Sequence, residues 1–111
     1  MKYTVTEEKG LVTLGLTGKI MGGPEATEIN DAINRLIDEK KIRIIIDLKN
    51  VELMNSSGLG ILIGAVTLLS NNNGGLRLIN VPAKVLALLK STKLNSVFHI
   101  CGTFEEAAAS F

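Results

Sequence analysis

The sequence has few aromatic residues and very few of the side chains that bind metals or form crosslinks. Of its 111 residues 4% are aromatic, none is tryptophan, and Cys101 and His99 are the single cysteine and the single histidine. One cysteine cannot close an internal disulfide, and one cysteine with one histidine cannot supply the ligand cluster of a zinc site. We therefore expect an aliphatic core, with no disulfide, no metal and no cofactor.

A strong charge of one sign and long apolar runs are also missing. The formal net charge is +1, which does not provide the broad basic field that nucleic-acid binding needs. The longest apolar run, 59–69, is broken by glycine and threonine and is shorter than the roughly 20 residues of a membrane-spanning helix. The first residues do not form the basic and then apolar pattern of a secretory signal. These features predict a cytoplasmic protein that neither binds nucleic acid nor inserts into a membrane.

Aliphatic side chains in regular patterns dominate what is present. Hydrophobic residues make up 46% of the sequence, enough to bury one core, and the length suits a single domain over residues 1–111. Alternating or β-branched runs predict strands, and apolar residues at helical spacing predict helices. In order, these are strands at 3–8 and 11–16, a helix at 24–38, a strand at 43–48, a helix at about 57–70, a strand at 76–80, a helix at 83–89, a strand at 97–100 and a last helix capped by Thr103 and Glu106.

The order of these elements predicts the fold class. Ile44-Ile45-Ile46 forms the middle of an almost wholly apolar run, which is typical of a central strand covered on both faces. Strand–helix–strand repeats require parallel strands joined by right-handed crossovers, whereas the first two strands form an antiparallel hairpin. We predict an α/β fold with the order ββαβαβαβα, in which a single mixed β-sheet of about five strands has helices packed against it.

The segment Met54-Asn55-Ser56-Ser57-Gly58-Leu59-Gly60 lies between a buried strand and an apolar helix. The amino end of such a helix exposes unpaired backbone N–H groups and the positive end of the helix dipole. A serine hydroxyl at this position is well placed to receive a phosphoryl group. Gly58 and Gly60 remove side chains from the first turn, which is expected to let the backbone of another protein approach the serines. The alternative is that the glycines at 58, 60 and 64 allow close packing of the helix on the sheet.

These residues resemble a known family. The run Ile44-Ile45-Ile46-Asp47-Leu48-Lys49-Asn50-Val51, followed by Ser-Ser-Gly-Leu-Gly at 56–60, is similar to the STAS domain and most closely to the bacterial anti-sigma factor antagonists. Gly18-Lys19-Ile20 and Val81-Pro82 match two further segments of that family. The resemblance covers essentially the whole chain and implies a binding module, not an enzyme.

The resemblance also implies a mechanism and partners. Members of this family bind an anti-sigma factor that is also a serine kinase, and a serine phosphatase reverses the modification. Phosphorylation of the first serine of the motif, here Ser56, ends the interaction. Met21 and Leu59 are expected to offer exposed apolar contact beside this serine. The residues expected to contact the partner are Met21, Asn55, Ser57, Gly58, Leu59 and Gly60.

Two departures from the family pattern favour an alternative. Asn55 stands where the family usually has Asp, and Met21 stands where it usually has an acidic residue. The alternative is a STAS subunit that does not switch, within a lipid-transport ABC complex or a stress-signalling scaffold. The sequence leaves the oligomeric state open between a monomer and a weak dimer.

Enzyme interpretations of the same residues are weaker. Gly58, Gly60 and Gly64 loosely resemble a dinucleotide fingerprint, but no acidic residue for a ribose hydroxyl follows at 78–80. A serine nucleophile needs a neighbouring base, and the only imidazole, His99, belongs to a late strand. Asp47 could either point at the serines or hydrogen-bond loop amides below them.

Overall fold

A computed structural model describes residues 2–111 and has the predicted order of elements. The helices are α1 (Pro24–Asp38), α2 (Ser56–Ser70), α3 (Ala83–Ser91) and α4 (Phe104–Ala109), and the strands are β1 (Lys2–Glu8), β2 (Leu11–Ile20), β3 (Arg43–Met54), β4 (Gly75–Ile79) and β5 (His99–Cys101). The strands form one five-stranded sheet in the order β1-β2-β3-β4-β5. β1 is antiparallel to β2, and the other pairs are parallel. The predicted mixed α/β fold is therefore confirmed.

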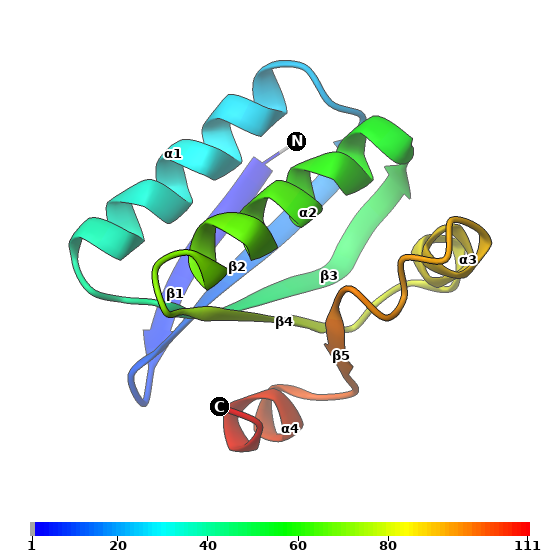
Figure 1. Cartoon of the computed structure of the whole chain (residues 1–111). Coiled ribbons are helices and arrows are strands. Elements are labelled where there is room, and N and C mark those ends of the chain that lie inside the picture. The colour runs from blue at the N-terminus through cyan, green and yellow to red at the C-terminus, as the bar shows by residue number, and fades with distance from the viewer. Residues whose placement is uncertain (1) are drawn as a thin grey trace.

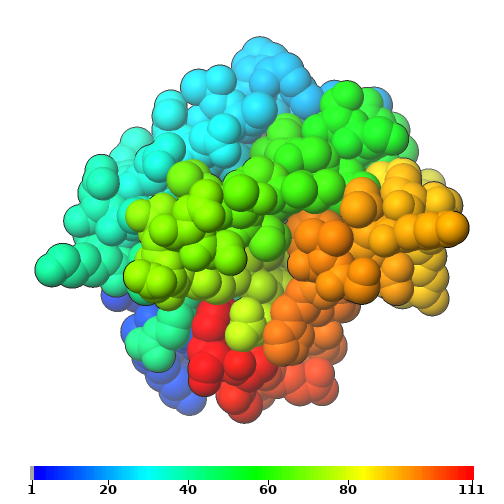
Figure 2. Space-filling view, in the orientation of Figure 1, coloured from blue at the N-terminus to red at the C-terminus, as the bar shows by residue number. Residues whose placement is uncertain are grey.

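The sheet carries helices on both faces, as predicted for its central strand. α1 and α2 lie side by side over one face, and α4 lies against the other (Figure 1). Ile44 and Ile46 of β3 point into the core under α1 and α2, whereas Ile45 joins a second cluster with Ala107 of α4. All three isoleucines are fully buried, as the two-residue alternation of a strand between two layers requires. The space-filling view shows α1, α2 and the region of α3 as one continuous surface on this side (Figure 2).

Three predicted strand boundaries are wrong. β2, expected to end at Leu16, continues to Ile20 because it keeps pairing with β3. The segment after Leu48, expected to be a loop, continues β3 as far as Met54 because it keeps pairing with β2. Val51 and Met54 are buried there, and the polar residues between them had suggested a loop. The last strand begins at His99, because Phe98 is buried in the main core and does not pair in the sheet.

The predicted cap of the last helix is confirmed. The Glu106 N–H donates to Thr103 Oγ1 at 3.2 Å, while Glu106 Oε2 accepts the N–H of Gly102 at 2.9 Å. These bonds satisfy donors that a helix leaves unpaired at its start. Over residues 2–111, no helix is both long enough and apolar enough to cross a bilayer.

Candidate functional site

The predicted site lies where two parallel strands end together. Ile20, the last residue of β2, pairs with Met54, the last residue of β3. Asn55 is the single residue between β3 and α2, so α2 starts directly above the strand ends (Figure 1). Ser56 is the first residue of α2 and is exposed, as is Ser57 after it. The fold thus presents the serines at the carboxyl edge of the sheet, where ligands of open α/β sheets commonly bind.

Asn55 caps α2 and leaves two amides free for an anion. Its side-chain Oδ1 accepts the N–H of Gly58 at 2.8 Å, and its carbonyl accepts the N–H of Leu59 at 2.9 Å. The amides of Ser56 and Ser57 precede the first bond within the helix, so they have no acceptor inside it. These donors and the helix dipole favour a negative group on or beside Ser56.

Gly58 and Gly22 fix how closely the site is packed. A Cβ atom on Gly58 would lie 2.0 Å from the carbonyl oxygen of Ile20, so the first turn of α2 rests on the backbone of β2. Gly22 has φ +98°, and a Cβ there would lie 2.9 Å from Cβ of Ser57. The expectation that Gly58 opens the helix to a partner is wrong, because Gly58 is buried against its own chain. Gly60 is exposed, with nothing within 4 Å of such a Cβ atom.

The apolar surface of the site differs from the predicted one. Met21 is 42% exposed, as expected, but Leu59 is 1% exposed and cannot contact a partner. α2 is apolar on nearly every side, and packing on the sheet turns Leu59 inward. Leu53, which the sequence reasoning missed, is 40% exposed in β3 beside Lys19 of β2. In the sequence, the only indication of an exposed apolar residue here is that Leu53 stands between the polar Glu52 and the apolar Met54 in the segment predicted to be a loop.

No charged side chain belongs to the segments that form this surface. Residues 21–23 and 53–60 consist of Met-Gly-Gly and Leu-Met-Asn-Ser-Ser-Gly-Leu-Gly. The Met21 N–H donates to Glu25 Oε2 at 2.9 Å, which ties the first segment to the start of α1. A phosphate on Ser56 would add about −1.5 to −2 charges at pH 7 and would be the only charge within these segments.

Groups that could support catalysis lie elsewhere. Asp47 Oδ1 accepts the N–H of Lys49 at 2.9 Å and Nδ2 of Asn80 at 3.1 Å, in the middle of β3, which agrees with the amide-binding alternative. His99, on the edge strand β5, pairs with Arg77 of β4, and Arg77 pairs with Ile45 of β3. Ile45 lies near the start of β3 and Met54 at its end, so His99 is far from the serines. Within the part of the chain that the structure describes, no three His, Cys, Asp or Glu side chains gather as a metal site.

The mixed sheet with helices on both faces is the architecture of a known domain family, and comparison with family models agrees. The model of the STAS domain matches residues 2–107. This chain therefore belongs to the STAS domain family, as the sequence motif predicted.

Solved structures share the fold at low sequence identity. A candidate anti-sigma factor antagonist from Thermotoga maritima superposes with a TM-score of 0.87 at 19% identity, over 97% of this chain and 92% of that one. The phosphorylated Bacillus cell-fate determinant SpoIIAA gives 0.72 at 21%, over 98% of each chain. A sulfate transporter family protein from Wolinella succinogenes gives 0.78 at 14%, over 95% and 87%. The fold is thus found in both antagonists and a transporter-family protein.

Proposed function

We propose that this chain is an anti-sigma factor antagonist that binds an anti-sigma factor with serine-kinase activity and is released when Ser56 is phosphorylated. The observation that carries the proposal is the exposed Ser56 hydroxyl at the first position of α2, in a surface segment without charge. The likeness of its fold to a candidate antagonist and to SpoIIAA, an anti-sigma factor antagonist that is also solved in a phosphorylated form, supports the proposal. The role is regulatory binding, and a separate phosphatase would restore the binding form.

The charge balance of the surface explains why one phosphate would be enough. An apolar and uncharged surface loses little on transfer from water into an interface, whereas an unpaired charge loses much more. In the strand register Lys19 lies beside Leu53, and its side chain is exposed. Pairing the phosphate with Lys19 inside an interface would also remove Lys19 from water, and the desolvation of two charges can exceed their Coulombic attraction. Phosphorylation would therefore disfavour the complex without disturbing the fold.

The modification itself can be tested with purified components. We expect a serine-kinase anti-sigma factor encoded near this chain to add one phosphate, located on Ser56 by peptide mass spectrometry. Ser57→Ala should be modified like the native chain, because Ser57 is a neighbouring exposed hydroxyl that is not the acceptor, and Ser56→Ala should remain unmodified. A phosphate located on another residue would contradict the assignment of Ser56.

The exposed apolar pair beside Ser56 should contribute to affinity. We expect Met21→Ala and Leu53→Ala each to weaken binding of the anti-sigma factor by roughly tenfold, because the minority of interface residues that lie near its centre cost more than about 1 kcal/mol when truncated, and these two lie beside the proposed central serine. Thermal unfolding should change little, since both side chains are about two-fifths exposed. Val97→Ala, at a residue with 43% exposure in the loop before β5, is the matched control. Unchanged affinity in both site variants would show that the partner docks elsewhere.

A second candidate function is a STAS subunit that does not switch, in a transport or scaffold assembly. The similarity to a sulfate transporter family protein favours this function. So do Met21 and Asn55, which stand where the antagonists usually have acidic residues. The kinase experiment separates the two functions. If the kinase phosphorylates a known substrate in the same assay but does not phosphorylate this chain, the STAS subunit that does not switch is favoured.

A further inference from the structure

β1 forms an open edge of the sheet. It spans seven residues, pairs only with β2, and keeps one continuous register from Lys2 to Glu8. It contains no proline, one of the residues that prevent pairing at a sheet edge, and its charged residues, Lys2, Glu7 and Glu8, lie toward its ends. Val5, in the middle of β1, is 51% exposed. The opposite edge, β5, has only three residues, so β1 is the edge on which another strand can pair.

The turn after β1 determines which backbone groups face outward. Lys9 and Gly10 connect β1 to β2 with φ of 56° and 76°, the conformation of a two-residue type I′ hairpin turn. In such a turn the flanking residues, here Glu8 and Leu11, are hydrogen-bonded to each other. Hydrogen-bonded and non-bonded pairs alternate along an antiparallel ladder. The free N–H and C=O groups of Tyr3, Val5 and Glu7 therefore point to the open edge.

We propose that β1 pairs antiparallel with β1 of a second copy of this chain, around a two-fold axis at Val5. In this register Val5 faces Val5, and Tyr3 faces Glu7, so the outward backbone groups meet as hydrogen-bonded pairs. Lys2 then lies opposite Glu8 of the second copy, and the symmetry repeats this ion pair on the other side of the axis. Opposite charges on facing strands stabilise pairing, whereas like charges weaken it.

The sequence of β1 is self-complementary only in this register. Thr4 lies opposite Thr6, a pair that can hydrogen-bond across strands. A shift of the second copy by two residues would place Lys2 opposite Thr6, or Glu8 opposite Thr4, and would lose both ion pairs. This match of charges identifies a second copy, and not an unrelated extended peptide, as the occupant of the edge.

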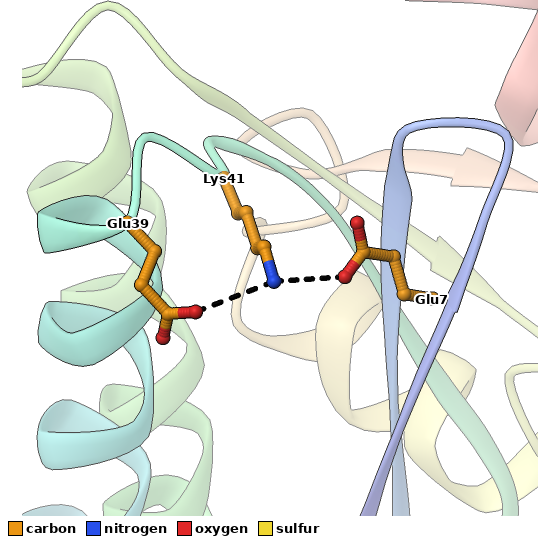
Figure 3. Close-up of polar contacts among 3 residues, drawn as sticks. All are labelled: Glu7, Glu39 and Lys41. Carbon is orange, nitrogen blue, oxygen red and sulfur yellow. Dashed lines mark ion pairs between the residues drawn. The ribbon is translucent and has the colours of Figure 1, made fainter.

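The surroundings of β1 leave the edge accessible. Lys41 Nζ lies between Glu7 Oε1 at 2.8 Å and Glu39 Oε1 at 3.3 Å (Figure 3). The contact with Glu7, followed by that with Glu39, raises the pKa of Lys41 above its usual value. Glu7 is thus neutralised on the helix side, where its charge would otherwise oppose pairing. A cavity of about 240 Å³ between β1 and α1 is lined in part by Val5. A strand paired with β1 would lie next to the opening of this cavity.

The pairing surface is separate from the Ser56 surface. β2 lies between β1 and β3, and Ser56 follows the carboxyl end of β3. Dimer formation therefore leaves the serines exposed, and its test does not depend on the proposed anti-sigma function.

A charge-swap experiment tests the register. We expect sedimentation equilibrium of the native chain to show a monomer–dimer equilibrium. Lys2→Glu and Glu8→Lys should each weaken the dimer by about tenfold, because both symmetric pairs become repulsive. The double variant should restore the native dissociation constant. A chain that stays monomeric up to about 1 mM would overturn the proposal, as would single variants that dimerise like the native chain.

A crosslink tests the position of the axis. Thr4 of one copy and Thr6 of the other form a non-hydrogen-bonded pair in this register, with Cα atoms about 4.5 Å apart, within the range of a disulfide. An oxidised mixture of Thr4→Cys and Thr6→Cys chains should form a covalent dimer, whereas either variant alone, in which the two cysteines lie diagonally, should not. The native Cys101 is buried and serves as the background. Equal crosslinking of the mixture and of either variant alone would contradict the register, and an extended peptide bound at β1 of a monomeric chain would contradict the second copy.

Discussion

Replacing Ser56 by Asp is expected to weaken binding of the anti-sigma factor by at least about thirtyfold. The change places a carboxylate in a surface whose own segments carry no charge, and an unpaired charge buried in an interface costs about 2–5 kcal/mol. Ser56→Ala removes only a hydroxyl and should bind like the unmodified chain. Both affinities can be measured by isothermal titration with the purified anti-sigma factor.

The fold should tolerate both substitutions at Ser56. A carboxylate in the first turn of a helix is favoured by the dipole by about 0.3–1 kcal/mol, so Ser56→Asp should unfold no earlier than the native chain. Ser96→Asp, at an exposed serine in the loop before β5, adds the same charge away from the site and should not change the affinity. If Ser56→Asp binds as tightly as Ser96→Asp, the proposed electrostatic switch is wrong.

Replacing Gly58 by Ala is expected to lower the free energy of unfolding by about 3 kcal/mol, the upper end of what overpacking typically costs. The new Cβ would lie 2.0 Å from the carbonyl oxygen of Ile20 and 2.8 Å from its carbonyl carbon, both backbone atoms that cannot move aside by a rotamer change. The first turn of α2 must lift off β2 or unwind. Overpacking at rigid sites is among the mechanisms that give large destabilisation. Urea unfolding followed by circular dichroism would measure the loss.

Gly60 provides the matched control for Gly58. It lies two residues later in the same helix, and nothing lies within 4 Å of a Cβ built there. Alanine is preferred to glycine inside a helix by about 0.5–1 kcal/mol, so Gly60→Ala should raise the unfolding midpoint. Similar stability of the two variants would mean that the contact between α2 and β2 is not tight in solution.

Much of the fold could be predicted because its signals are local. Pro24 opens α1, Thr103 and Glu106 cap α4, and the isoleucines at 44–46 mark the buried strand. Each of these patterns depends on residues a few positions apart, and the structure confirms them. The motif at 56–60 likewise indicated the family, because its serines and glycines follow directly after the strand. The place of Ser56 at a helix start follows from the same local order.

The errors arose where distant segments decide the outcome. β3 continues through Lys49, Asn50 and Glu52 because β2 offers it a parallel partner as far as Ile20, and no local pattern shows that partner. Leu59 is buried and Leu53 exposed for a similar reason. Because α2 is apolar on nearly every side, only its packing against the sheet shows which of its residues face the solvent.

Periodicity, caps and short motifs act over neighbouring residues, so they specify the order of the elements, the class of fold, the family and the serine at the start of α2. Contacts between distant segments make Gly58 a packing residue while Gly60 is exposed, and they leave Met21 and Leu53 on the surface beside Ser56. The same contacts leave β1 as an open edge. Burial and strand pairing depend on which segments meet in space, and chain neighbours do not specify that meeting.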